Sequence, residues 1–475
     1  MGLKVLNTLG MKKEEFTPLH EGEVRIYVCG PTVYDFIHIG NARAFIVADI
    51  VRRYLEYKGF KVTLVSNITD VDDKMIRRSQ ETGLSLQRLG EIYSNAYFED
   101  IDALNIKRPD TSPRATQHIS EMMEAIQKLI EKGYAYQVDG DVYFDVSKFE
   151  DYGKLSGNKT EALEAGARIE VNPKKKNPAD FALWKARKEG EPAWYSPWGW
   201  GRPGWHIECS TMAMKYLGET LDIHMGGKDL IFPHHENEVA QAEALTGKTF
   251  ARYWLHNEWL TVEGQKMSKS LGNFITVRDA LKICSPQVLR LLLISAHYRS
   301  PIDFNKENVN LAKTNFERIT NALERLASLM ERSDKRSYDE ALLNQIIEAK
   351  KRFEEAMDDD FNTPVALSAI FDMVKAINIY ADKNSDIEAE TKKKIYEIMK
   401  TLIEDILGIK VEIERKRSEE KDLVNGLMRI VLEVREEMRR RKEWKIADEI
   451  REKLKNLGFI IEDSPQGTRW RLREE

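Results

Sequence analysis

The chain has 475 residues, a formal net charge of −5 and 32% charged residues. This length allows several domains, and the near-neutral charge excludes a strongly basic global field, so any nucleic-acid surface must be local. We find no stretch near the roughly 18 apolar residues that cross a bilayer and no signal-peptide core. The three cysteines are too few for a disulfide framework, so we expect a cytoplasmic protein with no membrane partner.

The first predicted elements form a βαβ unit. Alternating apolar residues predict a strand over 24–30, and the motif His38-Ile39-Gly40-Asn41 opens a helix that Gly59 ends. A second strand is predicted over 61–65. The fold class expected from this start is α/β, a Rossmann-like doubly wound catalytic domain whose polar motif lies at the carboxyl edge of the sheet, where such sheets bind ligands.

A second motif, Lys266-Met267-Ser268-Lys269-Ser270, is predicted to lie in a loop. Together the two motifs indicate ATP chemistry. A helix N-terminus favours phosphate oxygens, and Gly40 lets the backbone approach a base or ribose closely. His38 can donate to charge that builds on the α-phosphate, while Lys266 and Lys269 can neutralise departing pyrophosphate.

Sulfur and nitrogen side chains suggest a metal site. Cys29 ends the first predicted strand, and Cys209 lies in the first turn of a helix predicted to begin near Trp205. Pro233 suits helical position N1 and places His234 and Glu238 one turn apart. Cys29, Cys209, His234 and Glu238 are a plausible tetrahedral zinc set. Ligand spacing alone leaves open that the cysteines are small buried hydrophobes and that His234 only packs.

The two motifs resemble the HIGH and KMSKS signatures of class I aminoacyl-tRNA synthetases, with Asn41 in place of the final histidine. The stretches 27–35, 201–210 and 229–238 are similar to cysteinyl-tRNA synthetases, and the similarity runs from Leu6 to about Arg471. The resemblance implies an ATP-dependent ligase that forms cysteinyl-adenylate and transfers cysteine to tRNA(Cys). It also implies one Zn²⁺ per chain and ATP with Mg²⁺ as substrate.

The resemblance assigns roles to single residues. In the family, residues matching Cys29, Cys209, His234 and Glu238 hold zinc, which the substrate thiolate joins; a zinc–thiolate bond separates cysteine from serine where shape alone cannot. His224 is expected beside this site. The residues expected to bind ATP are Thr32, His38, Gly40, Asn41, Lys266 and Lys269, with His38, Asn41 and both lysines catalytic. Those expected to bind cysteine are Gly30, Thr69, Trp205 and Asp229, with Asp229 on the α-ammonium.

Basic and aromatic residues lie together near the end of the chain. Residues 439–442 are four consecutive cations beside Trp444. This composition suits phosphate attraction and base stacking, although a solvated helical face is the alternative. The resemblance favours RNA, because Arg439, Trp444, Asp448 and Asp463 align with residues of the family's anticodon-reading domain.

We expect six segments along the chain. A helical pattern covers 277–407 with breaks near 332–338 and 382–386, and Thr363 is predicted as an N-cap with Pro364 at N1. The segments are 1–112, the first half of the Rossmann domain; 113–200, an insertion; 201–258, the second half; 259–310, the KMSKS loop and stem-contact region; 311–415, an α-helical bundle that binds tRNA; and 422–475, a small mixed anticodon-binding module.

Two alternatives remain. The related ligase that joins cysteine to an amino sugar in thiol-cofactor synthesis lacks the C-terminal module, so the region from Asn310 onward argues against it. A non-catalytic tRNA-binding paralogue would not need Lys266, Lys269 or the four metal ligands. Some family members are also linked to persulfide formation with pyridoxal phosphate through lysines near these motifs, a role in which Lys74, Lys266 and Lys269 could serve. We expect a monomer.

Overall fold

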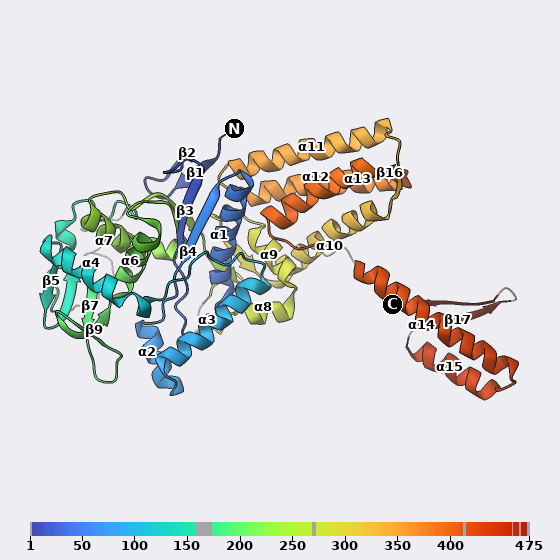
Figure 1. Ribbon diagram of the computed structural model, residues 1–475, viewed down its shortest axis with the longest axis horizontal. Coiled ribbons are helices and arrows are strands. Elements are labelled where there is room, and N and C mark those ends of the chain that lie inside the picture. Colours follow the sequence, from blue (N-terminus) through green and yellow to red (C-terminus); the bar gives the residue numbers. More distant parts are fainter. Residues whose placement is uncertain are drawn as a thin grey trace. The chain divides into compact units, whose positions relative to one another are not determined.

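The computed structural model describes residues 2–157, 173–267, 272–411, 415–457, 459–464 and 467–472. The chain divides into two compact units, Met1–Val411 and Glu412–Glu475 (Figure 1). Within 415–425 only the backbone is described.

A four-stranded parallel sheet is the centre of the first unit. Its order is β11-β10-β3-β4, and the strands are β3 (Glu23–Val28), β4 (Lys61–Ser66), β10 (Leu221–Gly227) and β11 (Ala251–Asn257). Parallel bridges from Val65 to Thr111 and from Ile68 to Arg114 continue the sheet beyond β4. Strand β10 is buried at six consecutive positions because helices cover both faces. This is the α/β arrangement expected from the sequence.

Helix α1 (Ile39–Tyr57) connects β3 to β4 and lies on one side of them, while α6 (Trp205–Leu217) and α7 (Glu236–Thr246) lie on the other (Figure 1). The polar motif His38–Asn41 therefore stands at the carboxyl end of β3. Gly59 follows α1 with a φ of 92°, a conformation that favours glycine.

Two predicted helix starts are wrong by one turn or less. Pro233 is not at N1 of α7, because Phe232 is extended (φ −134°, ψ 131°) and a π-helical turn, Ile231–His235, precedes the helix. The N-cap of α12 (Thr363–Lys383) is Asn362, whose side chain accepts from the Val365 amide at 3.4 Å. The Thr363 hydroxyl instead donates to the Ile294 carbonyl at 2.7 Å.

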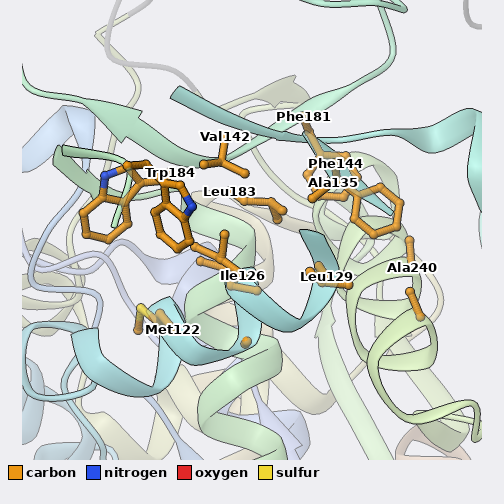
Figure 2. Close-up of a cluster of buried hydrophobic side chains, with 14 of the residues drawn as sticks. Met122, Ile126, Leu129, Ala135, Val142, Phe144, Phe181, Leu183, Trp184 and Ala240 are labelled. Atoms are coloured by element: carbon orange, nitrogen blue, oxygen red, sulfur yellow. The ribbon is translucent and has the colours of Figure 1, made fainter. Parts of the chain in front are cut away.

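The insertion forms a five-stranded antiparallel sheet in the order β5-β6-β7-β9-β8. Helix α4 (Ile119–Glu131) packs on it through a core that includes Ile126, Leu129, Phe144 and Trp184 (Figure 2). The strands are β5 (Ala135–Val138), β6 (Asp141–Phe144), β7 (Phe181–Ala186), β8 (Trp194–Ser196) and β9 (Gly199–Pro203). Strand β9 leads directly into α6.

A helical bundle ends the first unit. Its helices are α10 (Lys306–Ser328), α11 (Ser337–Asp358), α12 and α13 (Ala389–Lys400), followed by a π-helical turn, Thr401–Ile406. Contrary to the sequence expectation, α12 is long and apolar enough to cross a membrane by length and composition. It packs against α10 and α11, as the core helix of a bundle does, so this is weak support for a membrane span.

Buried Arg290 ties the bundle to the parallel sheet. It lies on α9 (Pro286–Ile294) and forms an ion pair with Asp49 of α1. Its Nε atom donates to the Leu407 carbonyl at 2.7 Å, and Nη1 donates to the Leu104 carbonyl at 3.0 Å. One side chain thereby connects three parts of the unit.

The remaining elements of the first unit are short or peripheral. They are β1 (Lys4–Asn7), β2 (Lys12–Glu15), α2 (Asp73–Thr82), α3 (Leu86–Ala103), β12 (Leu260–Val262), β13 (Gln265–Lys266), α8 (Val277–Ile283), β14 (Ile302–Phe304), β15 (Met330–Arg332), β16 (Asp386–Glu388) and the 3₁₀ turns Ala115–Gln117, Val146–Lys148 and Lys228–Leu230.

The second unit is a small mixed domain. It contains α14 (Arg415–Arg440), α15 (Trp444–Asn456), β17 (Phe459–Ser464) and β18 (Gly467–Leu472). The two strands pair as an antiparallel hairpin. Met428, Leu454 and Ile461 are buried in the core of this unit.

Candidate active site and metal cluster

The start of α1 is held by a reciprocal pair of hydrogen bonds. The Asn41 amide donates to His38 Nδ1 at 3.1 Å, and the His38 amide donates to Asn41 Oδ1 at 3.3 Å. Because Nδ1 of His38 accepts, a neutral ring carries its proton on Nε2, which leaves a donor on its outer edge. Gly40 allows close packing here: a Cβ atom would lie 2.9 Å from Nδ1 of His38.

Both signature motifs reach one cavity of about 370 Å³ at the carboxyl edge of the sheet. Thr32, His38, Gly40 and Asn41 line it from the α1 side, and Lys266 lines it from β13. The Lys266 Nζ atom lies 4.4 Å from the ring centre of Trp259, another lining residue. Residues 268–271, and with them Lys269, lie outside the described part of the chain.

Four predicted metal ligands from three separate segments meet in this region. One donor atom from each of Cys29, Cys209, His234 and Glu238 lies within 4.8 Å of the others. Oε1 of Glu238 is 3.4 Å from the Cys29 sulfur and 3.0 Å from Nε2 of His234. This nitrogen is buried without a hydrogen bond of normal geometry in the described residues. Two sulfurs, one nitrogen and one oxygen at this spacing fit a zinc ion.

A second set shares two of these residues. Cys29 and Glu238 also lie within 4.8 Å of His224 and His235. Cys29, Cys209 and His234 line the cavity, but His224 and His235 do not. An ion held by the first set therefore faces the cavity, whereas one held by the second set lies behind it.

Charges inside the cluster shift its pKa values. A hydrogen bond with the Cys29 thiol lowers the pKa of Cys209 to about 7, whereas burial raises that of Cys29. Burial raises the pKa of Glu238, but His224 and His234 outweigh burial and lower it to about 2. Cys209 and Glu238 thus reach their metal-binding forms near neutral pH.

Histidines that sequence reasoning did not single out surround the cluster. Nε2 of His235 is 3.2 Å from the Cys29 sulfur, and its Nδ1 is 2.7 Å from Nε2 of His256. His206 contacts His234 through their Nδ1 atoms at 2.8 Å. His224 was expected nearby, and its Nε2 is 3.0 Å from Oε2 of Glu238. His235 directly follows His234, which is the only signal the sequence offered for it.

The residues expected to hold cysteine do not all reach the cavity. Gly30, Trp205 and Asp229 line it, and the Trp205 ring stacks on His234 with centroids 3.9 Å apart. Thr69 is buried outside the lining, and its hydroxyl accepts from Asn67 at 3.0 Å. Gly30 is required because a Cβ atom there would lie 1.6 Å from the Asn67 carbonyl.

Buried Arg43 fixes the far wall of the cavity. Its guanidinium donates at 2.9 Å to the carbonyls of both Glu258 and Trp259, which line the cavity. It also donates to the carbonyls of His297, Tyr298 and Ser300. Burial lowers the pKa of Arg43 to about 10, so the side chain stays charged at neutral pH. Through Arg43, helix α1 thus holds residues 258–259, which precede the KMSKS motif in the chain.

In the second unit, three of the four predicted anticodon residues lie near the turn between α14 and α15. Trp444 is 56% exposed at the first position of α15, and Asp448 is exposed one turn later on the same face. Arg439 is in the last turn of α14. Asp463 is in β17, and its side chain lies outside the description.

Comparisons with known proteins extend over the whole chain. Residues 15–314 match the family described as tRNA synthetases class I (C) catalytic domain, 352–412 match the DALR domain, and 430–471 match the cysteinyl-tRNA ligase anticodon binding domain. The cysteine–tRNA ligase of Thermococcus onnurineus is 50% identical to this chain, over 99% of this chain and 99% of its own length. That of Clostridioides difficile is also 50% identical, over 99% of this chain and 100% of its own length.

The chain belongs to the cysteinyl-tRNA synthetase family. It is thus a class I aminoacyl-tRNA synthetase, a ligase of protein biosynthesis that uses ATP, an amino acid and tRNA. The family's enzymatic activity is that of a cysteine–tRNA ligase.

Solved structures agree with this fold. A Mycobacterium tuberculosis methionyl-tRNA synthetase in complex with methionyl-adenylate superimposes with a TM-score of 0.62 at 17% identity, over 81% of this chain and 92% of that one. A leucyl-tRNA synthetase of Agrobacterium radiobacter gives a TM-score of 0.61 at 11% identity, over 82% and 85%. At these identities the likeness concerns the fold alone.

Proposed function

We propose that this member of the cysteinyl-tRNA synthetase family activates L-cysteine with ATP to cysteinyl-adenylate and transfers cysteine to tRNA(Cys), and that one zinc ion per chain selects the substrate thiol. The observation that carries this proposal is the cavity itself: Cys29, Cys209 and His234, three members of the metal cluster, line the same space as His38 and Lys266.

The donor set explains the selection. A zinc ion, when bound, would take a thiolate as a ligand far more readily than a hydroxyl. Shape alone discriminates such near-isosteres by only ~1–3 kcal/mol. Beside the ligands, the Trp205 ring closes one side of the site, and the Asp229 carboxylate can accept from the α-ammonium of cysteine. His224 orients Glu238 through their 3.0 Å contact.

Phosphate chemistry falls to the two signature motifs. The Nε2–H of His38 can donate to the α-phosphate, and Thr32, Gly40 and Asn41 line the space around the bound nucleotide. Lys266 and Lys269 of the second motif would stabilise the negative charge on the leaving pyrophosphate. ATP would enter the cavity as its Mg²⁺ complex.

We infer that the chain acts as a cytoplasmic monomer with no membrane partner. The helical bundle would contact the tRNA stem, and the second unit would read the anticodon through Arg439, Trp444, Asp448 and Asp463. Exposed Trp444 can stack on an unpaired base, and the carboxylates can accept from base amino groups.

The test is ATP–pyrophosphate exchange with each of the twenty amino acids in turn, followed by aminoacylation of tRNA(Cys). We expect exchange with cysteine, almost none with serine, and loss of the cysteine signal after zinc is removed by a chelator. An amino-sugar ligase would show cysteine-dependent exchange without aminoacylation, and a non-catalytic tRNA-binding paralogue would show neither. The match of 430–471 to an anticodon binding domain disfavours the amino-sugar alternative.

A further inference from the structure

A short hairpin places Lys266 beside Trp259. Strands β12 and β13 pair antiparallel, and Lys266 is directly opposite Thr261. Trp259 is two residues before Thr261, so alternation along the chain places its side chain on the same face of the hairpin as that of Lys266. Diagonal neighbours of this kind reach one another when one is aromatic and the other is long. The Lys266 ammonium accordingly lies over the Trp259 ring, 4.4 Å from its centre.

Hydrogen bonds hold the backbone of this hairpin in place. The Trp259 carbonyl accepts from buried Arg43 at 2.9 Å and from the Ile302 amide at 3.3 Å. At the turn of the hairpin, the Gly264 amide donates to Asp303 at 2.8 Å. The bonds at Trp259 use only its carbonyl, so they fix where the ring lies without depending on the ring. A chain with another residue at this position would keep the wall of the cavity and lose the ring.

The ring is the principal partner of the Lys266 charge. No carboxylate in the described part of the chain forms an ion pair with Lys266. Lys228 also lies near the Trp259 ring, at 5.7 Å, but its ammonium is paired with Glu258 at 2.6 Å. The negative face of an indole attracts a cation within ~6 Å of its centre. The closer ammonium, which no described carboxylate neutralises, therefore interacts most strongly with the ring.

The location of the ring gives this contact a use. Trp259 and Lys266 both line the cavity that His38 lines. The Trp259 side chain is 44% exposed, so the packing of the core does not require an aromatic residue here. Fixing a long lysine side chain in one arrangement costs rotamer entropy. A charge that is already held at the wall of the cavity needs less reordering when negative charge develops on a leaving group.

We propose that the Trp259 ring holds the Lys266 ammonium at the wall of the cavity before ATP enters, and is thereby a positioning residue for adenylate formation. This inference rests on the proposed function and deepens it, because it names the group that places one of the two lysines of the KMSKS motif.

The experiment is a double-mutant cycle on the single-turnover rate of adenylate formation from cysteine and ATP. Trp259→Leu should lower this rate roughly 2- to 30-fold, the range expected for a cation over an indole, and leave the KM for cysteine unchanged. In a chain that already carries Lys266→Ala, adding Trp259→Leu should have little further effect, because no ammonium remains for the ring to hold.

Two further variants separate the ring from general packing. Trp259→Phe keeps an aromatic face and should stay closer to wild type than Trp259→Leu. Trp200→Leu is the matched control, because Trp200 is 55% exposed and does not line the cavity, and this change should leave the rate unaltered.

The cycle distinguishes this inference from its alternatives. Equal losses from Trp259→Leu with and without Lys266→Ala would overturn it, since the ring would then act on the nucleotide or on folding rather than on Lys266. A Trp259→Phe chain as slow as Trp259→Leu would overturn it as well. Absence of cysteine-dependent adenylate formation in the wild type would instead refute the proposed function.

Discussion

The sulfur of Cys29 lies 3.4 Å from Oε1 of Glu238, although 209 positions separate the two residues along the chain. This contact exists because β3 ends, and α7 begins, at the same edge of the parallel sheet. Cys29 and Glu238 also belong to both possible donor sets, so an ion in either set would use the same two residues.

The first prediction therefore concerns metal content. Protein purified without added metal should contain one zinc ion per chain by elemental analysis. Cys209→Ser should lower zinc content and cysteine activation together, because it removes a thiolate that faces the cavity. Cys284→Ser, at the half-buried cysteine outside the cluster, should keep both. Full zinc and full activity in Cys209→Ser would contradict the ligand assignment.

The second prediction separates chemistry from binding at Lys266. Lys266→Ala should lower the rate of adenylate formation about 10- to 100-fold with little change in the KM for cysteine, because its charge acts on the leaving pyrophosphate. Lys248→Ala, which removes an exposed lysine paired with Glu219, is the control. A raised KM with an unchanged rate would refute this role.

The third prediction tests the second unit. A chain ending at Val411, where the first unit ends, should keep cysteine-dependent pyrophosphate exchange, because the whole cavity lies in the first unit. Aminoacylation of tRNA(Cys) should fall by orders of magnitude, since each lost base contact costs ~1–3 kcal/mol by analogy with base readout in DNA. Equal charging by the shortened and full chains would show that Arg439 and Trp444 do not read the anticodon.

The fourth prediction concerns packing around Arg290. Gly408 has a φ of 67°, and a Cβ atom there would lie 2.4 Å from Nη2 of Arg290. Gly408→Ala should therefore displace a buried guanidinium from its partners and cost ~3–5 kcal/mol of unfolding free energy in a denaturant titration. Gly10→Ala has a similar φ but open space around it, and should cost only ~1 kcal/mol. Equal losses would show that backbone strain alone is responsible.

The fifth prediction is a pH dependence at Asp73. Partial burial raises its pKa, but the ion pairs with Lys185 and Arg202 outweigh burial and lower the pKa to about 2. A carboxylate whose pKa is depressed by folding stabilises the folded state above its unfolded pKa and loses this contribution as the pH falls toward 2. The unfolding free energies of wild type and Asp73→Asn should thus differ at pH 7 and converge as the pH is lowered from 4. A constant difference would contradict the shift.

Local sequence patterns predicted much of the first unit. The structure confirms the βαβ start and the helices that begin near His38 and Trp205. Each of these elements is specified by a pattern of residues close together in the sequence. Pro233 misled the prediction because proline is suited both to position N1 and to the turn before a helix, and periodicity cannot separate the two.

Sequence reasoning could not find contacts made by register and sheet order. His256 meets His235 because β11 lies beside β10, and Thr8, from near the start of the chain, supports His256 at 2.8 Å. The ring contact between Tyr195 and Trp200 likewise arises only when β8 is paired with β9. The roles of the predicted site residues stay predictions that the experiments above test.

The contacts of Arg43 also bear on how this site tolerates mutation over time. Within the described part of the chain, its five acceptors are all backbone carbonyls. Any residue type supplies such a carbonyl, so side chains at 258–259 and 297–300 are free to drift without weakening these bonds. Arg43 has no such freedom, because lysine lacks the planar array of donors. Homologues should therefore vary along the wall of the cavity while keeping the single arginine that shapes it.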